Sequence, residues 1–288
     1  FGHGAALVFD ESAFAKKGEK SVGVARQWNG RLGKTENSQV GVFAALVRDR
    51  ACALVDGELF VPEHWFDDPE RCREAGIPES LAFRTKGQIA LDLLLRLRRE
   101  GLRYSHVVFD AGYGHLPWLL NDLDDEGEIF LAEIHADQGI YLENPQPTIP
   151  ERTTPRGKVP KTLQAQSDVQ TVMAWARAQP ESAWRRLSVR AGEKGDVVAE
   201  YLTRRVFFWD GKAPQARRWH LLVRREIGGT KLKFCFANAK PQASLRRLAS
   251  MQADRHFVER AFEDAKSTCG MADYQARGWQ AWHHHMAL

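Results

Sequence analysis

Two aspartates and one glutamate stand out because of the residues around them. Asp10 and Asp110 each end a short apolar run, ALVFD and SHVVFD, and Glu259 lies far downstream in a segment with helical periodicity. A short apolar run is typical of a buried strand, so each aspartate is expected at the C-terminal end of one. Taken singly, an aspartate in this position is more often a turn or capping residue than a catalytic one.

Taken together, three carboxylates on two strands and a helix can converge at one edge of a sheet. Their oxygens are hard ligands that suit Mg²⁺ or Mn²⁺. Two such ions roughly 3.5 to 4 Å apart can activate an attacking oxygen and stabilise the leaving one in phosphoryl transfer. Because clustered carboxylates repel one another, we expect metal to order this site.

The elements that would position these acids follow from the spacing of apolar residues. Three apolar or β-branched stretches after Asp10 predict strands in hairpin connection, and a stretch of helical spacing closed by Gly101 predicts a helix. A helix and a further strand are expected after Asp110. These strands lie at 21–28, 39–47, 51–62 and 129–137, and the helices at 85–101 and 114–127.

The second half of the chain has a different character. A proline-rich stretch beginning near residue 144 predicts a long loop. A helix at 168–179 and strands at 197–211, 217–228 and 231–239 are expected beyond it. We interpret residues 145–240 as a β-rich insertion into a core formed by 1–144 and 241–288. The stretch 241–270 predicts a helix, with Glu259 off its apolar stripe.

Charge divides the chain in the same way. Residues 1–150 carry 16 Lys and Arg against 24 Asp and Glu, whereas residues 151–288 carry 25 against 13. A basic region attracts polyanions, which makes nucleic acid the leading partner, although solvated surface charge is the alternative. Five adjacent arginine pairs favour a phosphate-binding face: 185–186, 204–205, 217–218, 224–225 and 246–247.

Other residues that could do chemistry favour structural roles. The tryptophans at 175, 184, 209 and 219 could stack on unpaired bases but are more often core residues at apolar positions. Three consecutive histidines, 283–285, would point in different directions on a helix and could not bind one ion together. The four cysteines form no CxxC pair, so neither a zinc cage nor a disulfide framework is indicated.

The sequence contains no apolar run long enough to span a bilayer and no signal-peptide pattern at its start. We therefore expect a cytoplasmic protein without a membrane partner. The chain begins without Met and stops in an apolar stretch, which suggests a piece of a longer protein.

Three segments carry a family resemblance. VFDESAFAKKGEKSVGVARQWNGRLGKTENSQVGVFAALV resembles the first-aspartate region of bacterial insertion-sequence transposases of the DDE class, in the IS-four superfamily and nearest its IS-seven-hundred-one branch. VVFDAGYGH resembles their second-aspartate motif, and RHFVERAFEDAKSTCGMADYQARGWQAWHHH their glutamate region. Arg255, Glu259 and Lys266 have the spacing of the R, E and K in that superfamily's signature, which favours Glu259 over Glu263.

The resemblance implies a ribonuclease H-like α/β fold, a mixed sheet flanked by helices, with the β-rich insertion placed before the glutamate helix. It also implies that Arg255 and Lys266 contact DNA phosphates near the transposon end, a role that suits their charge. Lys16 and Lys17, close to Asp10, would either meet DNA near the cut or solvate a turn. The chain departs from the signature at three positions: Gln252 replaces a Tyr, and Ala13 and Ala15 stand where Gly and Pro are common.

The resulting hypothesis is a DNA transposase in which Asp10, Asp110 and Glu259 hold two Mg²⁺ ions, with Mn²⁺ as a substitute. Water attacks first and then a DNA 3′-hydroxyl, so strands are cut and transferred at insertion-sequence ends. The partners expected are double-stranded terminal repeats and target DNA, with an oligomer assembling on them. A domesticated, non-catalytic DNA-binding protein of the same fold is the alternative, and a nuclease or resolvase without strand transfer is a third.

Overall fold

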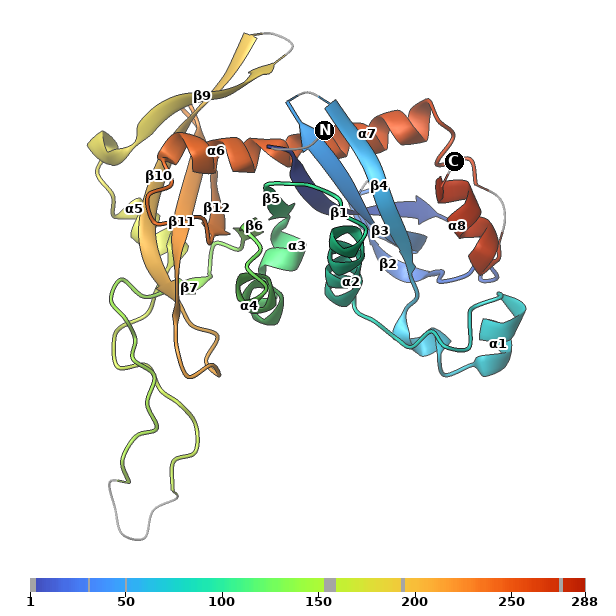
Figure 1. Ribbon diagram of the computed structural model, residues 1–288, viewed down its shortest axis with the longest axis horizontal. Coiled ribbons are helices and arrows are strands. Elements are labelled where there is room, and N and C mark those ends of the chain that lie inside the picture. The colour runs from blue at the N-terminus through green and yellow to red at the C-terminus, as the bar shows by residue number, and fades with distance from the viewer. Residues whose placement is uncertain are drawn as a thin grey trace. The chain divides into compact units, whose positions relative to one another are not determined.

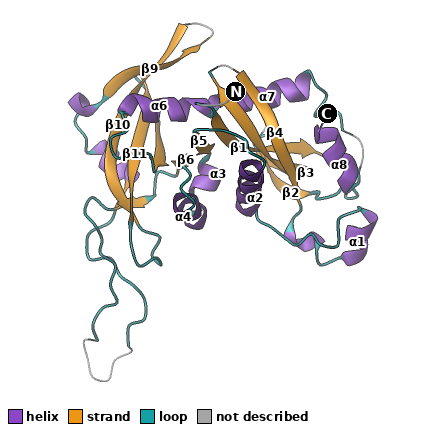
Figure 2. Cartoon of the chain, in the orientation of Figure 1, coloured by secondary structure: helices purple, strands orange, loops and turns teal. Residues whose placement is uncertain are grey.

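The computed structural model describes residues 4–30, 32–49, 51–152, 159–192, 195–274 and 277–287. The chain forms two compact units (Figure 1). Unit 1 comprises Phe1–Val108 and Asp254–Leu288, and unit 2 comprises Phe109–Ala253. Both mix strands with helices, as Figure 2 shows by colour, so the α/β class expected from the sequence is confirmed.

Unit 1 is built on long antiparallel strands. They are β1 (Ala6–Ala15), β2 (Ala25–Asn29), β3 (Lys34–Arg48) and β4 (Ala51–Phe60), followed by the short β5 (His106–Phe109). β3 pairs with β1, β2 and β4, and β5 follows β1 in the sheet order. The predicted hairpin strands are therefore confirmed. β5 is buried along its whole length, and Asp110 follows it directly, as the apolar run predicted.

Asp10 was expected at the end of its strand, and this expectation is wrong. β1 continues for five residues beyond Asp10, because the ladder to β3 is unbroken from Ala6↔Val47 to Ala15↔Ser38. The apolar run stops at Asp10, but backbone hydrogen bonds to a longer partner strand extend β1 past it.

The helices described in unit 1 are η1 (Glu63–Trp65), α1 (Pro69–Glu74), α2 (Lys86–Arg99), α7 (His256–Ser267) and α8 (Trp279–Ala287). Of these, α2, α7 and α8 pack on the strands. α2 begins at a capping box between Thr85 and Gln88, and its buried face, which includes Leu93 and Leu94, packs on β3 and β4. α7 packs on β1, β3 and β4, which places its residues beside the strand that carries Asp10.

The helix expected over 241–270 is two helices in the structure. α6 (Leu245–Asp254) and α7 are separated at Arg255, which is the N-cap of α7. The backbone of Arg255 keeps helical angles, φ −58° and ψ −33°, so only the hydrogen-bonding pattern is interrupted. Periodicity extends across this point, which is why the sequence suggested one helix.

Unit 2 contains a second antiparallel array with strand order β6-β12-β11-β10-β9. Its elements in chain order are α3 (Ala111–Gly114), α4 (Pro117–Asp125), β6 (Phe130–Ile134), β7 (Gly139–Ile140), β8 (Gln170–Thr171), α5 (Val172–Arg177), η2 (Glu181–Ala183), β9 (Arg185–Gly192), β10 (Gly195–Phe208), β11 (Arg217–Glu226), β12 (Leu232–Ala237) and nearly all of α6. Strand β9 has no counterpart among the predicted strands.

An aromatic cluster fills the centre of unit 2. Trp219 stacks on Phe208 with ring centroids 5.1 Å apart and meets Phe130 edge-on at the same distance. Phe236 closes the cluster at 5.9 Å from Trp219. Trp175 is also buried, so Trp175 and Trp219 are core residues, as favoured from the sequence.

The proline-rich stretch behaves as predicted in the part that the structure describes. Between residues 142 and 169, apart from 153–158, which lie outside the described residues, there is no helix or named strand. The bridge Thr148↔Gln164 joins its two arms. None of the described helices is long and apolar enough to cross a membrane.

Candidate active site

Asp10 projects from the middle of β1 and is mostly shielded from solvent. Its side chain is 14% exposed. One carboxylate oxygen, Oδ1, accepts a hydrogen bond from the backbone N–H of Glu11 at 2.7 Å, and the other, Oδ2, lies 3.9 Å from Nη2 of Arg255. A carboxylate held this way keeps a fixed direction, which a metal ligand requires.

Arg255 joins Asp10 to Glu259. Its Nη1 donates a hydrogen bond to Oε1 of Glu259 at 3.1 Å across one helical turn, while Nη2 faces Asp10. Two of the three predicted ligands, on a strand and on a helix, therefore converge on one guanidinium within unit 1. Since two carboxylates repel each other, a shared cation is what stabilises this arrangement.

Glu259, which the signature spacing favours over Glu263, is the acid that contacts Arg255. Phe257, Val258 and Phe262 form the buried face of α7, and Glu259 lies off that face with its side chain 58% exposed. Glu263 is exposed as well. Arg255 is four residues from Glu259, the separation at which two helical side chains meet.

Asp110 belongs to unit 2, where it caps a short helix. Its Oδ1 accepts hydrogen bonds from the backbone N–H groups of Gly112 at 2.9 Å and Tyr113 at 3.3 Å. This is the capping role that the sequence left open for a lone aspartate. A carboxylate offers about four lone-pair sites on its two oxygens, so an aspartate that caps a helix can also bind a metal ion.

Gly114 fixes the turn that follows Asp110. A Cβ atom added at this position would lie 1.8 Å from the carbonyl oxygen of Glu133 on β6. Only glycine allows the backbone of α3 to approach β6 so closely. The orientation of Asp110 therefore depends on the close backbone approach that glycine allows at position 114.

The lysines predicted to contact DNA lie on unit 1 in different environments. Lys266 donates a hydrogen bond to the carbonyl oxygen of Ala13 at 3.3 Å and lies over the Phe14 ring at 5.0 Å. Lys16 donates to the carbonyl oxygen of Tyr274 at 2.7 Å, and burial lowers its pKa. Lys17 is exposed.

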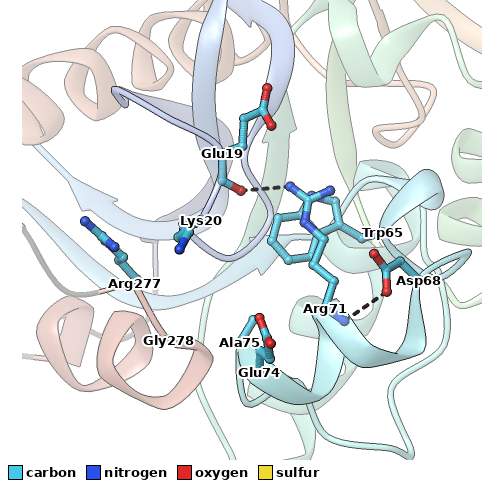
Figure 3. Close-up of a pocket in the computed structure, with 9 residues that line it drawn as sticks. All are labelled: Glu19, Lys20, Trp65, Asp68, Arg71, Glu74, Ala75, Arg277 and Gly278. Atoms are coloured by element: carbon cyan, nitrogen blue, oxygen red, sulfur yellow. Dashed lines mark hydrogen bonds between the residues drawn. The ribbon is translucent and has the colours of Figure 1, made fainter.

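Among the described residues of unit 1, Lys266 lines the smaller of two hollows considered for a ligand. That hollow, about 130 Å³, lies between the end of β1 and α7 and is also lined by Ala13 and Ala15, two of the three departures from the signature. The larger, about 510 Å³, contains none of the predicted site residues; in Figure 3 the guanidinium of Arg71 lies against Trp65, 3.7 Å from its ring centre. Acidic and basic side chains line this second hollow in similar number, so it favours no charged ligand.

Several arginines on the strands of unit 2 are paired with acids. Ion pairs tie Arg186 and Arg225 to Glu200, and Arg217 to Asp124 and Asp125. Arg225 also covers the Trp184 ring at 4.1 Å. The exposed members of the arginine pairs include Arg185 and Arg204.

The histidine run is structural in the described part of α8. Nδ1 of His283 donates a hydrogen bond to the carbonyl oxygen of Trp279 at 3.0 Å, and the two rings lie 4.3 Å apart. His285 stacks on Tyr274 with centroids 5.2 Å apart. Across the described residues, no group of three or more His, Cys, Asp or Glu side chains is arranged to hold a metal ion.

One contact near the site gave no signal in the sequence. Lys86, the first residue of α2, forms an ion pair with Glu11, the neighbour of Asp10. Seventy-five positions separate the two residues, so no local pattern joins them. The pair fixes the side chain next to Asp10 and anchors α2 to β1.

Residues 1–196 match the sequence pattern of the DDE superfamily endonucleases, a segment that contains both Asp10 and Asp110. The chain belongs to the DDE superfamily endonucleases. Among curated relatives, a probable transposase for insertion sequence element IS701 from Microchaete diplosiphon is 34% identical over 108 residues. That alignment covers 38% of this chain and 26% of the relative. The family assignment bears out the resemblance to insertion-sequence transposases.

A solved structure also resembles this DDE superfamily chain over much of its length. The NurA nuclease from Sulfolobus solfataricus aligns with 90% of this chain and 78% of its own, at 8% sequence identity and a TM-score of 0.37. Glu259 lies beyond the residues that the family pattern matches. Its assignment rests on its spacing from Arg255 and Lys266 and on the geometry of α7.

Proposed function

We propose that this protein cuts and rejoins DNA strands at the ends of an insertion sequence, with Asp10, Asp110 and Glu259 as ligands of two Mg²⁺ ions. The observation that carries the proposal is the convergence of Asp10 and Glu259 on Arg255. Family membership and the likeness to an IS701 transposase support the reaction class.

The residues of unit 1 fit a divalent cation. Asp10 and Glu259 supply oxygen donors, the type that Mg²⁺ and Mn²⁺ prefer, and they come from a strand and a helix packed together. Asp110 would add the third carboxylate. When bound, the two ions would activate the attacking oxygen, first of water and then of a DNA 3′-hydroxyl, and stabilise the leaving oxygen.

Arg255 has two alternative partners in this proposal. Its planar fork of N–H donors suits carboxylates and phosphates equally well. Without DNA it neutralises Asp10 and Glu259, and with DNA it would turn one or more of its N–H groups to a backbone phosphate. Lys266 lines a hollow beside β1 and would contact the same strand, while Lys16 and Lys17 would extend the basic surface.

The double-stranded partners would be the terminal repeats of the element and its target DNA, held by an oligomer of this chain. Exposed arginines of unit 2, such as Arg185 and Arg204, would supply phosphate contacts that do not depend on sequence. We further propose that residues 145–240 form the β-rich insertion of a ribonuclease H-like core.

The decisive experiment is the substitution Asp110→Asn, assayed on DNA that carries the element's terminal repeats. Mg²⁺-dependent cleavage should be abolished, while folding and DNA binding persist, because Asn retains the cap acceptor but not the charge. Asp122→Asn, on the exposed side of α4, is the matched control and should cleave normally. Full cleavage by Asp110→Asn would overturn the assignment.

A non-catalytic DNA-binding protein is the second candidate, and one observation favours it. Gln252, which replaces the signature's Tyr, is 6% exposed and donates from Nε2 to the sulfur of Cys235 at 3.3 Å. This buried side chain does not offer DNA the contact expected of a surface Tyr. Mn²⁺-dependent nicking of terminal-repeat DNA separates the candidates, since a pure binding protein would only shift the DNA. Joined ends among the products would separate a transposase from a nuclease or resolvase.

A further inference from the structure

A fully buried histidine lies on β5 and uses both ring nitrogens. The side chain of His106 is 0% exposed. Its Nε2 lies 3.0 Å from Oδ2 of Asp254, and its Nδ1 lies 2.8 Å from Oγ of Ser105. Ser105 in turn bonds Ala5, through Oγ at 3.0 Å and through its backbone N–H at 2.7 Å.

The direction of these bonds follows from the chemistry of the groups. An ionised carboxylate only accepts, so Nε2 of His106 carries a hydrogen and donates it to Asp254. The Ser105 hydroxyl has one hydrogen, which it can give to Nδ1 of His106 or to the carbonyl of Ala5. All of these polar groups are satisfied inside unit 1, and removing one leaves a buried neighbour without its bond.

The chain of bonds joins the three segments that lead to the proposed ligands. Ala5 immediately precedes β1, which carries Asp10, and His106 begins β5, which leads to Asp110. Asp254 ends α6 and is the direct neighbour of Arg255, at the start of the helix that bears Glu259. Asp10 comes five residues after Ala5, Asp110 four residues after His106, and Glu259 five residues after Asp254.

We propose that Ser105, His106 and Asp254 form a positioning chain, which fixes the start of α7 against β1 and β5 and thereby sets the metal affinity of the site. The inference rests on the proposed function. Asp254 holds the backbone next to Arg255, and Arg255 orients Asp10 and Glu259, so a shift at Asp254 moves the carboxylates. His106 and Asp254 act through these neighbours and touch neither metal nor DNA.

The test measures Mn²⁺ binding to the intact chain by electron paramagnetic resonance, without DNA. Asp254→Ala should weaken Mn²⁺ binding by about tenfold, the loss typical when a group that orients a metal ligand is removed. Asp254→Asn keeps an oxygen that accepts from Nε2 and should stay within about threefold of the parent. Asp264→Ala removes an exposed acid from α7 that is outside this chain of bonds, and it should bind Mn²⁺ like the parent.

Rescue by Asn distinguishes positioning from simple loss of charge, because Ala and Asn both remove the negative charge of Asp254. If Asp254→Ala does not fold, Ser105→Ala provides the same test with a smaller deletion. We expect Ser105→Ala to weaken Mn²⁺ binding about twofold to threefold, less than the roughly tenfold loss expected when a whole orienting group is removed. Unchanged Mn²⁺ affinity in the folded deletion variant, or equal loss in the Ala and Asn variants, would overturn the inference.

Asp10→Asn separates this result from a failure of the proposed function. If Asp10→Asn abolishes Mn²⁺ binding and Asp254→Ala leaves it unchanged, the metal site stands and the positioning chain is wrong. If Asp10→Asn leaves Mn²⁺ binding intact, the proposed metal site is wrong, and the positioning inference falls with it.

Discussion

The two units use arginine in different ways. In unit 1, Arg255 lies between two carboxylates on different elements and holds them together. In unit 2, arginines lie along antiparallel strands and pair with acids on neighbouring segments, as Arg186 and Arg225 do with Glu200. The first arrangement brings together two carboxylates of the proposed site, whereas the second pairs charges along the surface of a sheet.

This difference shows that charge counted along a sequence overstates the charge available to a ligand. Residues 151–288 carry an excess of twelve positive charges, 25 against 13, yet several of their arginines are engaged by acids. The acidic half contributes carboxylates to the proposed catalytic site. Arginines that remain exposed, such as Arg185 and Arg204, are the better candidates for DNA contacts.

The largest expected effect concerns the acids gathered in unit 1. Glu259→Gln should lower Mg²⁺-dependent cleavage by about 1,000-fold, since a neutral amide cannot replace a carboxylate that stabilises transition-state charge through metal. Glu263→Gln, one turn along α7, is the control and should change cleavage by less than about threefold. Single-turnover cleavage of terminal-repeat DNA measures both. Equal losses would remove the distinction between these two acids.

Close backbone packing should make unit 2 sensitive at Gly114. Gly114→Ala places a Cβ 1.8 Å from the carbonyl of Glu133, a backbone atom that cannot move alone, so we expect a loss of about 3 kcal/mol in unfolding free energy. In unit 1, a Cβ at Gly57 would meet the Phe43 ring at 2.4 Å. A ring can turn, so Gly57→Ala should cost less, about 1 to 2 kcal/mol. Urea denaturation tests this order, and a larger loss at Gly57 would contradict it.

The contrast between exposed and paired arginines can be tested on DNA affinity. The double substitution Arg185→Gln/Arg204→Gln should weaken binding about tenfold and lower the slope of log affinity against log salt by about 2. Arg217→Gln/Arg224→Gln, which removes equal charge from ion-paired positions, should weaken it by about threefold or less. Fluorescence anisotropy at several salt concentrations gives both quantities. If both double variants change the salt slope equally, ion pairing does not reduce the contribution of an arginine to DNA binding.

The smallest expected effect is a pH dependence shared by both units. Burial lowers the pKa of His220 in unit 2 and of His283 in unit 1 below the ordinary value of 6.5. Below pH 6.5 the unfolded chain takes up protons that the folded chain does not, so stability falls as the pH falls toward the lowered pKa values. Above that window these histidines contribute no pH dependence.

Thermal unfolding between about pH 7.5 and pH 5.5 measures this loss. His220→Gln should remove the part that belongs to unit 2, and His283→Gln the part that belongs to unit 1. His284→Gln changes an exposed histidine in the same helix as His283 and serves as the control. An acid-induced loss that is unaffected by both substitutions would place the responsible groups elsewhere.

Much of the fold could be predicted because it is encoded locally. The apolar runs before Asp10 and Asp110, and the helical spacing before Gly101, are short patterns that fix strands and a helix. Strand β9 was missed because its segment, RRLSVRAG, contains few apolar residues and is held by pairing with β10. The sequence likewise gave no reason for β1 to continue past Asp10, since that extension depends on β3.

By itself, the sequence determined the acids, their order and the spacing of Arg255, Glu259 and Lys266, because residue identity and local periodicity lie within short windows. Only the tertiary structure decided what those residues touch. The contact of Arg255 with Asp10, and that of His106 with Asp254 across 148 positions, join segments with no local pattern in common. Such contacts arise when strands and helices pack, so their hydrogen bonds and charges are decided by the packing.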